Sequence, residues 1–210
     1  MEWTDDMIKQ CAKPCGELGR FVGERMNESH SELWQWGLSH ISIKDNSTIL
    51  DVGCGGGGAI NLLASFAIRS RILGIDFSKE MVELAKKINH ALIANRRVEI
   101  LYGEVLYLPF ADNTFDVVTA FETYYFWLNI VNCLKEIKRV LKTGGIIIMV
   151  NETYKHPQFE EKNSHLAKLL NMEYHTPNEF MDLLQVAGYS TVEVFTIPEK
   201  NWITAAGKKN

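Results

Sequence analysis

Apolar residues recur along this chain at two different spacings, which divide it into two parts. Over 17–41 they fall mostly three or four residues apart, and this spacing predicts one or two helices. The members of this apolar face are Leu18, Phe21, Val22, Met26, Leu33, Trp36 and Leu38. The polar segment 42–47 is typical of a linker. We therefore expect residues 1–45 to form an N-terminal helical cap on a core that occupies 46–210 of the same domain.

From residue 48 onward, short apolar runs alternate with stretches of helical spacing. The runs predict strands at 48–52, 71–76, 98–102, 115–121, 146–150, 190–197 and 201–206. Helices are predicted at 59–67, 78–92, 127–142 and 176–188, with a lid insertion at 151–175. This alternation predicts an α/β fold, a doubly wound Rossmann-like seven-stranded sheet that is mostly parallel with an antiparallel C-terminal strand. Helices should cover both faces, and ligands should bind at the carboxyl ends of the strands.

Local signals mark the ends of several predicted helices. Ser78 is a suitable N-cap for one of them. The run from Thr176 to Glu179 is a capping box with proline at the first helical position, and Gly188 closes the same helix. The pair Gly144-Gly145 is predicted to end the helix at 127–142.

Composition narrows the range of partners. The chain has 210 residues, with 22 basic and 26 acidic side chains and a net charge of −4. The net negative charge argues against nucleic acid as a partner, because phosphate binding usually requires a basic surface. No apolar run approaches the roughly 20 residues of a membrane span, and the acidic start lacks the apolar segment of a secretory signal. We therefore expect a cytoplasmic protein with no membrane association.

The four cysteines do not predict a metal site. Cys11 and Cys15 are four residues apart, but an iron–sulfur run would place its third ligand at Leu18. A zinc site on this pair would need two further ligands, for which only His30 and His40 are nearby. In a reducing compartment the expected state is free thiols, with no metal.

A glycine-rich loop follows the first predicted strand and opens a helix. Asp51-Val52-Gly53-Cys54-Gly55-Gly56-Gly57-Gly58 fits two templates. One is the dinucleotide fingerprint GxGxxG, and the other is the [DE]xGxGxG loop of S-adenosylmethionine-dependent methyltransferases. Asp76 ends the second strand, where a carboxylate can accept from both ribose hydroxyls in either case.

The rest of the core favours the second template, since it resembles class I methyltransferases, especially the small-molecule branch related to quinone-pathway enzymes. The resemblance covers about 48–150. Its further motifs are Gly74-Ile75-Asp76-Phe77-Ser78, Gly103-Glu104-Val105 followed by Leu108-Pro109-Phe110, Phe115-Asp116-Val117-Val118, and the run LKEIKRVLKTGG at 134–145. Two positions depart from the family pattern: Glu104 replaces an aspartate, and Thr143 replaces a proline.

The resemblance implies a role for each matching residue toward S-adenosyl-L-methionine. Asp51 and the glycine loop would hold the methionine part, with Gly53, Cys54, Gly55 and Gly57 as the loop positions. Asp76 would bind the ribose and Phe77 would flank the adenine. Glu104 would accept from the adenine amino group, the Val105 amide would meet a ring nitrogen, and the Phe121 backbone would help to hold the cofactor's amino group.

The charge of the cofactor agrees with the acids at the strand ends. S-adenosylmethionine carries a sulfonium, an ammonium and a carboxylate, and is therefore a net cation. We expect four acids to converge there, namely Asp51, Asp76, Glu104 and Glu122. A pyrophosphate-bearing ligand would be repelled by the same acids. A nicotinamide oxidoreductase and a noncatalytic cofactor-binding module remain the alternatives to a methyltransferase.

The segment after the fourth predicted strand is expected to face the methyl acceptor. Glu122 could accept a proton or orient an amine, and Tyr124, Tyr125 or Trp127 could form the acceptor wall. We take Glu122 and Tyr124 as the candidate catalytic residues. The [DNS]PP[YF] motif of nucleic-acid and protein amide methyltransferases is absent, which favours a small-molecule acceptor whose identity the sequence does not give. Lids at 1–45 and 151–175 would supply polar residues such as Asn27, His30, His156 and His175.

Overall fold

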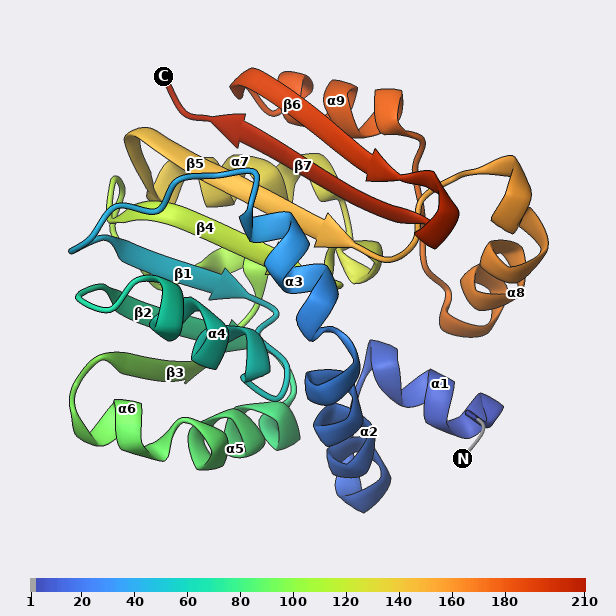
Figure 1. Ribbon diagram of the computed structural model, residues 1–210, viewed down its shortest axis with the longest axis horizontal. Helices are drawn as coiled ribbons and strands as arrows, with labels where there is room; N and C mark the ends of the chain where they lie inside the picture. The colour runs from blue at the N-terminus through green and yellow to red at the C-terminus, as the bar shows by residue number, and fades with distance from the viewer. Residues whose placement is uncertain (1–2) are drawn as a thin grey trace.

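A seven-stranded sheet runs through the computed structural model, which describes residues 3–210 (Figure 1). The strand order is β3-β2-β1-β4-β5-β7-β6. The strands are β1 (Thr48–Val52), β2 (Arg71–Asp76), β3 (Val98–Tyr102), β4 (Phe115–Phe121), β5 (Leu141–Asn151), β6 (Ser190–Ile197) and β7 (Trp202–Lys208). Strands β1 to β5 are parallel, and β7 pairs with β5 and β6 in the antiparallel sense. The predicted fold class is confirmed, including the antiparallel C-terminal strand.

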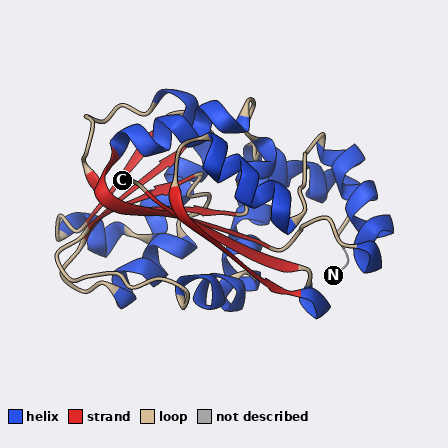
Figure 2. Cartoon of the chain, turned by 90° about the horizontal axis from the view of Figure 1, so that it is seen from above, coloured by secondary structure: helices blue, strands red, loops and turns tan. Residues whose placement is uncertain are grey.

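Helices cover both faces of the sheet, as the view from above shows (Figure 2). They are α1 (Asp5–Ala12), α2 (Gly16–Ser29), α3 (Ser31–Leu38), α4 (Gly58–Phe66), α5 (Lys79–Ile88), α6 (His90–Ala94), α7 (Ile130–Val140), α8 (Glu160–Leu170) and α9 (Pro177–Val186). One apolar layer joins α3, α4 and α5 to the sheet, and another joins α7 and α9 to the opposite face. The inner strands are therefore buried on both sides, which explains their continuous apolar runs.

The chain order places the topological switch point between β1 and β4. From β1 the chain proceeds outward to β2 and β3, and it then returns to build β4 and β5 on the other side. The loops that leave the carboxyl ends of β1 and β4 consequently separate to opposite faces and open a crevice between them. The N-terminal helices α1 and α2 lie at this end of the sheet (Figure 1).

Most predicted strand boundaries are confirmed, but the region around α7 is not as expected. The predicted helix at 127–142 is wrong at both ends, since α7 begins at Ile130 with Asn129 as its N-cap and ends at Val140. Leu141 already pairs with Phe115 of β4, and Lys142 donates to Asp116 of the same strand at 2.7 Å. The pair Gly144-Gly145 therefore lies inside β5 and does not cap the helix.

Helix-end signals elsewhere are confirmed, and two helices escaped prediction. The Ser78 hydroxyl accepts from the Met81 amide, and both bonds of the Thr176–Glu179 capping box are present. Gly188 has a φ of +88° just after α9, as expected for a left-handed residue that closes a helix. The helices that the pattern did not predict, α1 and α8, pack against each other. The single helix predicted at 78–92 is wrong in its length, because the chain breaks at Asn89 into α5 and α6.

Helix α3 attaches the N-terminal cap to the sheet through a close contact between Gly37 and Val150 of β5. A Cβ atom on Gly37 would lie 2.3 Å from a methyl carbon of the fully buried Val150. Only glycine allows the helix backbone to approach the strand this closely. Because α2 directly precedes α3, this contact also fixes where α2 lies over the carboxyl end of the sheet.

Replacement of Gly37 by alanine should lower the free energy of unfolding by about 1–3 kcal/mol, because the added methyl forces α3 away from β5. The measurement is denaturant unfolding of the wild type, Gly37→Ala, Val150→Ala and the double variant. Removal of the facing methyls should relieve the clash, so the double variant should lose less stability than the sum of the two single losses. Additive losses would contradict the proposed contact.

Candidate active site

Two adjoining cavities open at the switch point between β1 and β4. The larger has a volume of about 340 Å³ and is lined at its base by Gly53, Asp76, Phe77, Glu104 and Val105. The smaller, of about 80 Å³, lies under the N-terminal cap. The two share five lining residues, namely Gly53, Asp76, Phe77, Thr123 and Phe126. A single elongated ligand could therefore extend from one cavity into the other.

The glycine loop lies between β1 and α4 and forms one wall of the smaller cavity. Gly53 has a φ of +68°, and a Cβ atom there would lie 2.1 Å from the Thr123 hydroxyl oxygen. Asn27 of α2 clamps the far side of the loop, because its amide nitrogen donates to the Gly56 carbonyl at 3.2 Å and its amide oxygen accepts from the Gly58 amide at 3.1 Å. The cap thus contacts the loop directly.

Asp51 lies in the wall of the smaller cavity, and its carboxylate is buried. One of the two carboxylate oxygens is hydrogen-bonded and the other is not. Asp51 is 1% exposed, and its Oδ1 accepts from the Thr119 hydroxyl at 2.7 Å. Its Oδ2 is buried and has no hydrogen-bond partner in the described chain. Burial raises the pKa of Asp51 to about 7, while the Thr119 hydrogen bond opposes that rise. Such an acceptor lacks the partner that buried polar atoms normally have.

Asp76 lines both cavities and also supports the loop. Its Oδ2 accepts from the Gly55 amide at 2.9 Å, and its Oδ1 accepts from the Ser78 amide at 2.8 Å. Burial raises the pKa of Asp76, and the two amide hydrogen bonds oppose that rise. Asp76 therefore has a structural role that the sequence did not predict, in addition to any contact with a ligand.

The remaining predicted cofactor residues divide between the two cavities. Glu104 and Val105 line the larger one, beside Trp127 and Cys133, and Phe77 lines both. Cys54, Gly55 and Phe121 line the smaller one. Gly57 lines neither: it has a φ of +80° at the N-cap of α4, and its carbonyl accepts from Asn89 at 2.9 Å.

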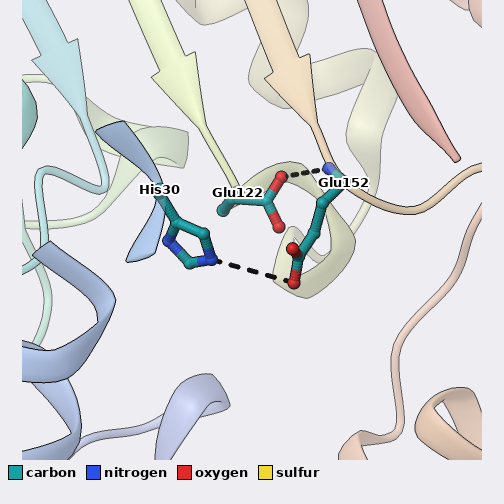
Figure 3. Close-up of side chains that lie close together, drawn as sticks. All are labelled: His30, Glu122 and Glu152. Atoms are coloured by element: carbon teal, nitrogen blue, oxygen red, sulfur yellow. Dashed lines mark hydrogen bonds and ion pairs between the residues drawn. The ribbon is translucent and has the colours of Figure 1, made fainter. Parts of the chain in front are cut away.

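Glu122 lies at the carboxyl end of β4, where it meets side chains from two other elements (Figure 3). Its φ of +55° is left-handed. The Glu152 backbone amide donates to its Oε1, and the Tyr125 hydroxyl lies 3.4 Å from its Oε2. Burial raises the pKa of Glu122 well above its ordinary value, and the negative charge of Glu152 raises it further. His30, from the junction of α2 and α3, faces the same group.

The structure does not bring Tyr124 to the candidate site, so its expected contact with an acceptor is not supported by its position. Its ring is fully buried in the core, where it packs against Tyr125, Phe180 and His175, and it lines neither cavity. The three residues Tyr124–Phe126 form a 3₁₀ turn, which directs Phe126 and Trp127 toward the cavities and Tyr124 inward.

The two predicted lids differ in their relation to the site. The cap contributes Cys11, Met26, Asn27, His30 and Trp34 to the smaller cavity. Within the described residues, no side chain of 151–175 lines either cavity, and α8 from this segment packs instead against α1. Asn27 and His30 of the cap are thus brought to the site, whereas His156 and His175 are not.

Sequence reasoning missed three residues around the site: Thr119, Thr123 and Glu152. Thr119 orients Asp51, Thr123 contacts Gly53, and Glu152 joins Glu122. Glu152 follows the carboxyl end of a parallel strand, which is the signal that led us to Asp51 and Asp76.

In the part of the chain that the structure describes, no helix has the length and apolar character needed to cross a bilayer.

Comparison with known families gives a match over the core. Residues 50–149 match a family model described as a methyltransferase domain. A demethylmenaquinone methyltransferase of Bacillus cereus (strain AH187) is 37% identical over 109 residues, which cover 51% of this chain and 46% of that protein. An O-methyltransferase of Penicillium expansum, cnsE, is 27% identical over 94% of this chain and 66% of its own length. The chain spans about one to two thirds of the length of the curated relatives that it matches.

Solved structures agree in fold. A chain from the complex of the Haloferax volcanii Trm112 methyltransferase activator with a methyltransferase superposes with a TM-score of 0.77 at 21% identity, covering 99% of both chains. Geranyl diphosphate C-methyltransferase from Streptomyces coelicolor A3(2) gives a TM-score of 0.75 at 14% identity, covering 86% of this chain and 76% of that one. With the family model and the glycine loop, these findings confirm the predicted resemblance. Over residues 50–149, the chain is similar to class I S-adenosylmethionine-dependent methyltransferases.

Proposed function

We propose that this chain binds S-adenosyl-L-methionine and transfers its methyl group to a small molecule, releasing S-adenosylhomocysteine. The observation that carries the proposal is the free, buried Oδ2 of Asp51 in the wall of the smaller cavity. An unpaired buried carboxylate oxygen is costly, and a cationic ligand would supply the partner that the protein does not. The ammonium group of the cofactor's methionine part is such a ligand.

The two cavities suit the two ends of this cofactor. The methionine part would lie in the smaller cavity against the glycine loop and Asp51, with the Phe121 backbone helping to hold its amino group. The adenosine part would lie in the larger cavity, with its ribose on Asp76 and its adenine beside Phe77. Glu104 and the Val105 amide would then contact the adenine edge. Glu104 is one methylene longer than the family's usual aspartate, so its side chain must bend back for the carboxylate to reach the adenine amino group.

The acceptor would lie between Glu122 and the cap. Residues of 1–45 form the cover of the smaller cavity, and we propose that they act as the lid, with α8 of 151–175 supporting α1 from outside. This enclosure favours a small acceptor, which would attack the sulfonium methyl in line while water is excluded. Glu122 is the proposed proton acceptor. Relatives named as sterol 4-C-methyltransferase, demethylmenaquinone methyltransferase and O-methyltransferase show how varied the acceptors of such chains are.

Two alternatives make different predictions for ligand binding. A nicotinamide oxidoreductase would bind NADH, although Asp51 and Asp76 would repel its pyrophosphate. A noncatalytic module would bind S-adenosylhomocysteine but would transfer no methyl group to any compound of a broad metabolite extract. Calorimetry with S-adenosylhomocysteine and with NADH, followed by a radiolabelled methyl-transfer assay, separates the three.

Asp51→Asn should weaken the binding of S-adenosylhomocysteine at pH 8 by about 10–100-fold, the range expected for the loss of one hydrogen bond to a charged group. In the wild type, the affinity should rise about tenfold from pH 6 to pH 8, because Asp51 must ionise to pair with the ligand's ammonium. In the variant this rise should be reduced. Calorimetric titration at several pH values provides the measurement.

A control for this prediction is Asp45→Asn, which removes an acid from the exposed side of the molecule, where Asp45 pairs with Arg69. It should leave the affinity and its pH dependence unchanged. Equal affinities of the wild type and Asp51→Asn at pH 8 would contradict the assignment of Asp51 to the ammonium group.

Asp51→Asn should also stabilise the protein without ligand, because the side chain keeps its hydrogen bond with Thr119 and no longer places a charge in the core. In the wild type, the pKa of Asp51 is higher in the folded state than in the unfolded state. The free energy of unfolding therefore falls as the pH rises from about 4 to 7. The variant should therefore match the wild type near pH 4 and exceed it by about 2–4 kcal/mol at pH 8. Urea unfolding at both pH values measures this difference, and a variant less stable at pH 8 would disprove the account of Asp51.

A further inference from the structure

His30, Glu122 and Glu152 bring three potential metal ligands together from three separate elements. His30 lies at the junction of α2 and α3, Glu122 follows β4, and Glu152 follows β5. One ligand atom from each of the three lies within 4.8 Å of the others. Figure 3 shows the three side chains pointing toward a common space. Among the described residues, no cysteine belongs to this group.

The spacing of the group exceeds that of a hydrogen-bonded cluster and is close to that of a metal site. The His30 Nε2 and Glu152 Oε1 atoms are 3.7 Å apart, which is longer than the 2.7–3.2 Å of an ordinary hydrogen bond. A first-row divalent ion holds nitrogen and oxygen at about 2.0–2.2 Å, so two ligands of one ion lie about 3–4 Å apart. Small side-chain movements would therefore complete a three-ligand site.

The surroundings hold Glu122 in the required orientation. The Glu152 amide donates to one of its oxygens, and the Tyr125 hydroxyl approaches it while accepting from the Thr153 amide at 3.0 Å. Such outer contacts are typical of metal-binding carboxylates. The site is also open to an entering ion, since the Glu152 side chain is 47% exposed and the His30 side chain 13%.

The two carboxylates lie close together, and in the described part of the chain neither forms an ion pair with a lysine or arginine, although the positive charge of Lys162 acts on both from a greater distance. The salt bridge within this group joins His30 and Glu152. A histidine imidazole with two carboxylates suits divalent ions such as Zn²⁺, Mn²⁺ and Fe²⁺. Hard oxygen-seeking ions such as Mg²⁺ would more commonly be held without the imidazole.

We propose that His30, Glu122 and Glu152 bind a first-row divalent metal ion beside the smaller cavity, leaving coordination positions free for an oxygen-bearing acceptor. The sequence pattern, by contrast, predicts no metal site. Because His30 and Glu122 line that cavity, the free positions would face the space proposed for the acceptor. Metal binding itself does not depend on the proposed methyl transfer.

The test uses the full-length chain after treatment with a chelator, titrated with CoCl₂ or MnCl₂ alone. Cobalt binding is followed by visible absorption and manganese binding by electron paramagnetic resonance. We expect one ion per chain in the wild type. Glu152→Gln should weaken binding at least about tenfold, since changes even to outer-shell partners of a metal cost about 10–100-fold. Glu152 is the preferred variant because its partly exposed side chain allows substitution with little effect on folding.

Two controls make the outcome decisive. Asp45→Asn removes an exposed acid that pairs with Arg69 away from this group, and it should leave metal binding unchanged. His30→Gln should weaken binding like Glu152→Gln, and thermal unfolding of each variant shows that the fold is retained. Absence of stoichiometric binding, or binding that both Glu152→Gln and His30→Gln preserve, would overturn the proposal. Binding of S-adenosylhomocysteine, measured in parallel, tests the proposed function separately.

Discussion

The burial of carboxylates at the carboxyl end of the sheet is the constraint on which the site depends. Strands β1 and β2 are buried on both faces, so Asp51 near the end of β1 and Asp76 at the end of β2 are almost entirely removed from solvent. Asp76 is satisfied by two backbone amides of the loops around it. Asp51 is only half satisfied. The protein therefore keeps an unfavourable negative charge that a cationic ligand can neutralise.

The N-terminal cap and the core are joined at this same place. Gly37 allows α3 to approach Val150, and this contact places α2 over the glycine loop, where Asn27 holds Gly56 and Gly58. A ligand on the loop and the position of the cap are consequently linked through one asparagine. The same placement brings His30 close to Glu122 and Glu152, which follow β4 and β5. The N-terminal cap therefore covers both the proposed cofactor region and the proposed acceptor region.

The sequence was most informative where local pattern and chemistry coincide. The runs at 48–52 and 71–76 fall on strands with the expected boundaries, and the acids at or near their carboxyl ends, Asp76 and Asp51, both line the smaller cavity. The α7 region was predicted wrongly because Leu141 and Lys142 continue a helical pattern, whereas pairing with β4 places them in a strand. Tyr124 and Tyr125 are neighbours of the same type, and only the 3₁₀ turn determines which of them meets Glu122. The contacts of Asn27 and His30 join segments far apart along the chain, which no local pattern predicts.

The most direct test of this account is the pKa of Asp51, measured by carbon-detected NMR of its carboxyl group with and without S-adenosylhomocysteine. Without ligand, the carboxyl should titrate at about 7 because it is buried. With the ligand's ammonium beside it, the pKa should fall toward the ordinary aspartate value of about 3.9. A carboxyl that titrates near 3.9 in the free protein, or a raised pKa that the ligand leaves unchanged, would contradict the claim that a buried charge at this position binds the cofactor.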